Sequence, residues 1–253
     1  MEDVTWPCDV RTNFAEKNLG CRERVISGIS WAFTLVEEAI ILEDDCLPDP
    51  SFFPYCQELL ERYRGDSRIG MISGDNFAEE ALQTEYSYFF SRMPAIWGWA
   101  TWKPAWEGYD RHLERWPEIK RANLLSEMFD DPATVRFWTA RFDEMHDDTG
   151  PNTWDYQWTY TNFIHNTLTI VPRVNLVKNI GFGTDATHTK EPNGSLIVAA
   201  KSLDWPLRHP PSFLPLRSVD QSAQKLHLPP AFVPGKIRGA RRRIRKLLEH
   251  LKS

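Results

Sequence analysis

Three consecutive carboxylates, Glu43, Asp44 and Asp45, are the residues of this sequence best suited to chemistry. They directly follow the apolar run 39–42, which predicts a strand buried on both faces. Three negative charges at the end of such a strand repel one another strongly unless a positive partner compensates them. Hard oxygen ligands suit magnesium or manganese, so we predict a divalent cation here. A bound cation could neutralise a diphosphate and support its departure as a leaving group.

The alternative interpretation of these acids is structural. Acids that lead into a helix interact favourably with its dipole, and Asp49-Pro50 predicts that a helix begins just downstream. Asp49 is already the expected N-cap, so three further acids exceed what capping needs. Ligands of open α/β sheets also bind at the carboxyl ends of strands. The functional interpretation is therefore preferred.

The elements around the acids predict an α/β domain. Apolar residues at helical spacing over 25–36 predict a helix, and the strand 39–42, a helix over 52–63 and a strand over 69–72 follow. This rhythm is typical of a mixed, mainly parallel sheet flanked by helices. Trp97, Trp99 and Trp102 fall in a later expected strand, where we predict that their rings share one face.

The stretch from Ile40 to Phe53, in which Glu-Asp-Asp precedes Cys-Leu-Pro-Asp-Pro-Ser-Phe-Phe, resembles the acidic-motif region of GT-A glycosyltransferases. It is particularly similar to bacterial family-2-like sugar transferases and to the N-acetylglucosaminyltransferase that starts complex N-glycan branching. The resemblance extends over residues 15–190. It implies a Rossmann-like GT-A fold, a UDP- or GDP-linked sugar donor, and a Mn²⁺ or Mg²⁺ ion.

The same resemblance implies roles for the residues. Asp45 matches the acid that binds the metal, and Glu43 and Asp44 match acids that contact the sugar and the ribose of the donor. Ser27 and Gly28 match donor-side positions that follow the nucleotide-binding unit of the family.

Asp155 is implied as the catalytic base, because Trp154-Asp155-Tyr156-Gln157-Trp158 resembles the helix start that carries the base in this family. An inverting transfer needs one carboxylate near the acceptor hydroxyl to take its proton. The alternative is a first-turn acid that interacts only with the helix dipole. Together with the acids upstream, the catalytic role is preferred.

His188 lies in the glycine-containing stretch 179–189 and resembles the late histidine that completes the metal site in many GT-A enzymes. A polar loop histidine is the alternative, and both remain open. Trp97, Trp99 and Trp154 are expected to bind the acceptor, because flat aromatic rings stack on sugars. Core packing is the alternative for these tryptophans.

Composition and charge restrict the class of protein. Of 253 residues, 42% are hydrophobic and 26% charged, which excludes wholesale disorder. A net charge of −5 excludes the overall basic charge that is typical of nucleic-acid-binding proteins. No pair of the four cysteines has CxxC spacing, no signal sequence opens the chain, and no apolar run has the length of a membrane span. These features predict a cytoplasmic protein with reduced thiols.

Three segments are expected. Residues 1–192 form the GT-A core, the proline-rich residues 193–235 an extended linker or a segment that wraps around the core, and residues 236–253 a basic amphipathic helix. This helix would dock on an anionic inner membrane face, where lipid-linked acceptors reside, or pack its apolar stripe on the core. The residues before 25 are too few for the strand-helix-strand unit that binds the nucleotide base in the family. We therefore expect an N-terminally truncated core, or a second polypeptide that supplies this unit.

The sequence thus predicts a metal-dependent inverting glycosyltransferase, peripheral at the membrane, that serves cell-envelope polysaccharide synthesis. It would move a hexosyl or N-acetylhexosaminyl group from a nucleotide-diphosphate donor to a glycan or lipid-linked acceptor. Two alternatives are non-catalytic: a carbohydrate-binding protein, and a degenerate transferase that acts only as a partner. A metal-dependent nucleotidyl- or phosphotransferase would share the acidic strand end but would not need Asp155.

Overall fold

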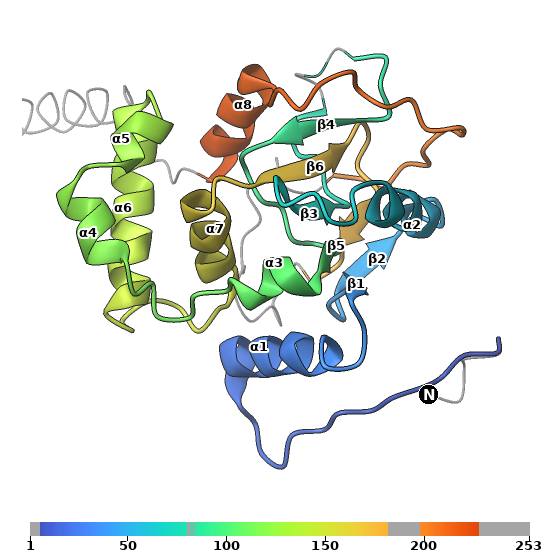
Figure 1. The fold of residues 1–253 in the computed structure, drawn as a ribbon, viewed down its shortest axis with the longest axis horizontal. Coiled ribbons are helices and arrows are strands. Elements are labelled where there is room, and N and C mark those ends of the chain that lie inside the picture. Colours follow the sequence, from blue (N-terminus) through green and yellow to red (C-terminus); the bar gives the residue numbers. More distant parts are fainter. Residues whose placement is uncertain (1–5, 80–81, 83, 182–197, 228–253) are drawn as a thin grey trace, which may run out of the picture.

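The computed structural model describes residues 6–79, 82, 84–181 and 198–227 (Figure 1). The elements in chain order are α1 (Gly20–Ala32), β1 (Glu38–Ile41), β2 (Cys46–Pro48), α2 (Phe52–Arg62), β3 (Ile69–Ser73), β4 (Tyr88–Ser91), β5 (Trp99–Trp102), α3 (Lys103–Glu107), α4 (Trp116–Arg121), α5 (Leu125–Met128), α6 (Pro132–His146), α7 (Asp155–Ile164), β6 (Leu168–Pro172), β7 (Val177–Asn179) and α8 (Arg217–His227). The chain is therefore α/β, as predicted.

The central sheet has five strands in the order β1-β5-β3-β6-β4. Among the strands of the described residues, only β3 and β6 pair in parallel; β1–β5, β3–β5 and β4–β6 are antiparallel. The prediction of a mainly parallel sheet is therefore wrong. The strands β1 and β3 run in the same direction, but β5 lies between them and opposes both. The sequence patterns of β1 and β3 do not indicate that β5, which follows them in the chain, inserts between them.

Helices cover both faces of the sheet. Alternate residues of β1 point to opposite faces: Ile40 packs with the core cluster of α2, whereas Ala39 and Ile41 pack with the cluster of α1 and α7. Trp99 and Trp102 of β5 also belong to these two different clusters. The prediction that the tryptophans share one face is wrong, because residues three apart on a strand point to opposite sides.

Helices α4, α5 and α6 form a further layer beside α7, away from the sheet (Figure 1). This layer has its own aromatic core, to which Trp116, Phe137, Trp138 and Phe142 contribute. Asp131 caps α6 by accepting hydrogen bonds from the backbone N–H groups of the first turn. The layer therefore fixes the position of α7, whose first residue is the predicted base.

Residues 198–216 are not a free linker. Leu203 and Leu207 are buried in the core cluster of α2. Asp49, predicted as the N-cap of α2, lies two residues before the observed cap Ser51, and its carboxylate accepts hydrogen bonds from Ser51 and Ser202. The predicted boundary at 192 and the predicted helix 236–253 lie outside the described residues. Among the described helices, none has the length and apolar character needed to cross a bilayer.

Trp99→Ala should lower the free energy of unfolding by about 3–5 kcal/mol, because it leaves a cavity in a packed aromatic cluster. Trp99 is 0% exposed, whereas Trp6 is 64% exposed, so Trp6→Ala is the matched control. We expect the control to change stability by less than about 0.5 kcal/mol. Urea unfolding followed by circular dichroism measures both variants, and equal effects would contradict the core position of Trp99.

Candidate functional site

One pocket of about 600 Å³ is lined by Glu43, Asp44 and Asp45 together with Asp155. The first three follow β1 and the fourth opens α7, so the fold brings together carboxylates that lie far apart in the sequence. Asp75, which follows β3, lines the same pocket. Five carboxyl side chains of the described part of the chain therefore surround one space.

The backbone around Asp45 is held by the small sheet of β2 and β7. The Ile180 N–H donates to the Asp45 carbonyl at 2.8 Å, and the Cys46 N–H donates to the Glu43 carbonyl at 3.1 Å. Gly181 packs directly on the Asp45 carboxyl, and any side chain at position 181 would meet it. The β2–β7 pairing therefore fixes Asp45 against the glycine of the following turn.

Burial and the nearby acids together shift the pKa values of two groups in the pocket. Burial and the neighbouring Asp45 raise the pKa of Glu43 to about 7, with smaller contributions from Asp155 and Asp44. Burial, followed by Glu43, Asp155 and Asp45, raises the pKa of the Cys21 thiol, which also lines the pocket. A site that raises acid pKa values in this way favours a cation or a neutral ligand over a bare anion.

Asp155 is the first residue of α7, and its neighbours hold it firmly. The Thr153 hydroxyl donates to Asp155 Oδ1. The Trp154 ring stacks on Trp99 with centroids 5.6 Å apart, and the Tyr109 hydroxyl donates to the Trp154 carbonyl at 2.9 Å. The tryptophan cluster beneath the pocket thus sets where α7 begins and where the Asp155 carboxylate lies.

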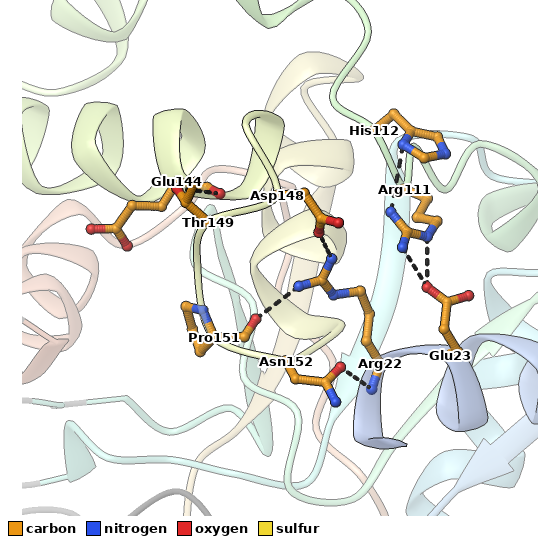
Figure 2. Close-up of polar contacts among 9 residues, drawn as sticks. All are labelled: Arg22, Glu23, Arg111, His112, Glu144, Asp148, Thr149, Pro151 and Asn152. Atoms are coloured by element: carbon orange, nitrogen blue, oxygen red, sulfur yellow. Dashed lines mark hydrogen bonds and ion pairs between the residues drawn. The ribbon is translucent and has the colours of Figure 1, made fainter. Parts of the chain in front are cut away.

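The loop that leads into Asp155 is fastened to α1 by Arg22 (Figure 2). The buried Arg22 guanidinium pairs with Asp148 and donates to the Pro151 carbonyl at 3.0 Å. The Arg22 N–H donates to Asn152 Oδ1 at 3.3 Å. Helix α1 therefore contributes to the site mainly by holding the α6–α7 loop.

The structure does not bring every predicted residue to the pocket. Ser27 is exposed on α1 and donates to the Arg24 carbonyl, and neither Ser27 nor Gly28 lines the pocket. Trp99 and Trp154 are buried in the same core cluster, as in the alternative interpretation, and the Trp154 ring, 1% exposed beside the pocket, is not available to stack on an acceptor; Trp97 lines the pocket and is partly exposed. His188 lies outside the described residues.

Asp75 is the main residue of the pocket that the sequence reasoning missed. It is fully buried, and burial raises the pKa of its carboxyl well above the ordinary value. The backbone N–H of Trp97 donates to Asp75 Oδ2 at 2.7 Å. A signal was present, because Gly74-Asp75-Asn76 follows a predicted strand just as the acidic triplet does.

The carboxylates suit a hard divalent cation by donor chemistry. Within the described ranges, no group of three or more His, Cys, Asp or Glu side chains is arranged to enclose a metal. Magnesium in nucleotide sites is commonly held by one or two carboxylates together with substrate phosphates, a mode that needs no such group. Asp45, with its fixed backbone and its position in the acidic pocket, fits this mode.

A second pocket, of about 530 Å³, lies by the start of β3 and the end of α7. Several of its polar side chains are bonded within the protein: Asn162 bonds to Trp158 and Thr167, and Asp66 pairs with Arg68. None of the predicted site residues lines it. The acidic pocket is therefore the better candidate for function.

No protein-family model and no curated protein sequence matches this chain.

Arg22→Met should release the loop before Asp155, because methionine fills the space but makes none of the guanidinium hydrogen bonds. We expect amide exchange over residues 148–153 to rise at least tenfold, which corresponds to about 1.4 kcal/mol of local stability. Arg11→Met, which removes an exposed pair with Asp9, is the control and should leave this loop unchanged. Mass spectrometry measures the exchange. Unaltered amide exchange over residues 148–153 in Arg22→Met would contradict the role of Arg22 in holding this loop, which we call the Arg22 clamp.

Asp75→Asn should gain stability over the wild type as the pH rises. Because the pKa of Asp75 is raised in the folded state, the folded chain keeps a proton that the unfolded chain releases above about pH 4. Wild-type stability therefore falls by about 1.4 kcal/mol per pH unit between the unfolded and folded pKa, and the asparagine variant lacks this loss.

Asp66→Asn is the control with the opposite sign, because Arg68 lowers the pKa of Asp66. That stabilisation is present above the unfolded pKa and disappears as the pH falls through the folded pKa. Asp66→Asn should therefore lose stability relative to the wild type toward neutral pH. Urea unfolding over a pH series tests both variants, and a pH-independent difference for Asp75→Asn would contradict its raised pKa.

Proposed function

We propose that this chain is a metal-dependent inverting glycosyltransferase core related to the GT-A enzymes. The observation that supports this most is the shared pocket of the acidic triplet and Asp155. A donor site and a catalytic base must lie in one space for a sugar to pass between them. The strands β1 and β3 run in the same direction, and each is followed by an acid that lines the pocket. This arrangement is compatible with a ligand site at the carboxyl ends of the two strands.

In this proposal the acidic triplet binds the donor. Asp45 holds Mn²⁺ or Mg²⁺, and Glu43 and Asp44 contact the sugar and ribose of a UDP- or GDP-linked donor. When bound, the cation neutralises the diphosphate and stabilises it as a leaving group. The raised pKa of Glu43 supports this assignment, because a pocket with crowded like charges gains most from a cation.

Asp155 acts on the acceptor. Its carboxylate accepts the proton of an acceptor hydroxyl while the hydroxyl oxygen bonds to the anomeric carbon and the bond from that carbon to the diphosphate oxygen breaks. Thr153, Trp154 and the Arg22 clamp orient this carboxylate. Trp97, which is partly exposed, lines the pocket in which the acceptor would lie.

The partners belong to the same proposal. The acceptor is a glycan or a lipid-linked glycan of the cell envelope, reached from the cytoplasmic side. Docking through residues 236–253 and metal binding by His188 remain predictions, because both lie outside the described residues.

Calorimetric titration with UDP and with GDP, each with and without Mn²⁺, tests the donor site. We expect Mn²⁺-dependent binding of one nucleotide that is lost in Asp45→Asn and kept in Asp155→Asn. Asp9→Asn, an exposed acid outside the pocket, is the control. Nucleotide binding that ignores both Mn²⁺ and Asp45 would reject the proposed donor site.

A second experiment tests the catalytic base by measuring the release of UDP or GDP from the matching nucleotide sugars in the presence of methyl glycosides as acceptors. Asp155→Asn should lower turnover by about 10²- to 10⁴-fold, the usual contribution of a positioned base. Full turnover in Asp155→Asn would remove the assignment of this residue as the base.

A further inference from the structure

Asp75 has one carboxyl oxygen in use and one without a partner. Its Oδ2 accepts the Trp97 N–H at 2.7 Å, whereas its Oδ1 is buried and makes no hydrogen bond with the described residues. The residue also lines the acidic pocket. Buried polar atoms almost always have partners, so such an exception in a pocket wall points to a ligand.

The backbone around Asp75 prevents it from turning away. The Asp75 N–H donates to Ser73 Oγ at 2.9 Å, and the Gly74 N–H donates to the Gly98 carbonyl at 2.8 Å. On the other side, the Asn76 N–H donates to Asn175 Oδ1 and its amide group donates to the Pro172 carbonyl. The carboxyl is thus held in place in the way that a binding group requires.

An aromatic pair stands next to this carboxyl. Phe77 and Trp97 meet edge to face, with ring centroids 5.0 Å apart and planes at 85°. Both are partly exposed and both line the acidic pocket. Asp75 connects them, because it lies two residues before Phe77 and accepts the Trp97 N–H. Apolar ring surface beside a hydrogen-bonding carboxyl suits a ligand with one apolar face and a polar edge.

We propose that Asp75, Phe77 and Trp97 form a subsite for a sugar ring, in which the C–H face of the ring packs on the aromatic pair and a hydroxyl hydrogen-bonds to Asp75 Oδ1. A sugar ring is uncharged, so it enters a pocket with five carboxyl groups without needing a counter-ion, unlike a phosphate. The assignment of this sugar as the acceptor rests on the proposed transferase function. Sugar binding itself does not.

The ionisation of Asp75 agrees with this role. Burial raises its pKa well above the ordinary value, which favours the protonated carboxyl, the form that can both donate to and accept from a hydroxyl. Asparagine has the same capacity and can still accept the Trp97 N–H, whereas leucine can do neither. Asp75→Asn and Asp75→Leu therefore separate hydrogen bonding from charge.

The test uses the full chain and methyl glycosides of glucose, galactose, mannose and N-acetylglucosamine, with binding followed by saturation-transfer NMR. We expect at least one glycoside to bind, with affinity reduced tenfold or more in Asp75→Leu and largely kept in Asp75→Asn. Phe77→Leu should weaken binding several-fold. Phe53→Leu, the same change at an exposed ring outside the pocket, should have no effect.

Two results would overturn the subsite: no binding of any of the four glycosides to the wild type, or equal binding by the wild type, Asp75→Leu and Phe77→Leu. If Asp75→Leu does not fold, the comparison of Phe77→Leu with Phe53→Leu decides. Thermal unfolding of each variant identifies that case.

UDP and GDP titrations with Mn²⁺ on the same variants separate this inference from the transferase proposal. Nucleotide binding that is unchanged in Asp75→Leu, together with lost glycoside binding, supports both. Glycoside binding that depends on Asp75 in a chain that binds neither nucleotide keeps the sugar subsite and rejects the transferase. Nucleotide binding with no dependence of glycosides on Asp75 does the reverse.

Discussion

The crowding of carboxyl groups around one pocket is the constraint on which the rest of this structure depends. Glu43, Asp45 and Asp155 lie around one pocket, where burial, followed by Asp45, raises the pKa of Glu43, and burial, followed by Glu43, Asp155 and Asp45, raises the pKa of the Cys21 thiol. Like charges at such separations push their elements apart, so the elements that carry them must be joined by strong packing elsewhere. The scaffold under the pocket meets this need with aromatic rings and with one buried arginine.

The tryptophan cluster is the larger of these two supports. Trp99 comes from β5, Trp106 from α3, and Trp154 and Trp158 from the start of α7. The centroids of contacting rings in this cluster are 5.4–6.4 Å apart. One strand of the sheet is thereby joined to the helix that carries Asp155. The high tryptophan content of the chain is explained largely by this cluster and by the core of the α4–α6 layer, and only in part by pocket walls.

Arg22 supplies the support that packing cannot, because the α6–α7 loop has carbonyl groups and an aspartate that need partners. A guanidinium with several fixed donors can satisfy such groups together. Helix α1 thereby acts on the pocket through Arg22, whereas Ser27 and Gly28 of the same helix do not line the pocket. Asp75, which lines the pocket, is also held by hydrogen bonds of the neighbouring backbone, but its Oδ1 has no hydrogen-bond partner among the described residues. The lining of the pocket thus includes the acidic triplet and Asp155 together with Asp75, Phe77 and Trp97.

The sequence alone determined the local parts of this arrangement. An apolar run followed by acids identifies β1 and the triplet, and helical spacing locates α2, because these signals depend on neighbours within a few residues. It also identified Asp155 as a partner of the triplet, although only by resemblance. The tertiary structure decided which strands pair, and it places β5 between β1 and β3. Strand order could not be read from the sequence, because it depends on the burial of whole faces of the sheet and not on the residues next to each strand. The tertiary structure also decided that Trp99 lies in the core while Trp97 faces the pocket, since exposure depends on which helices cover each face of the sheet.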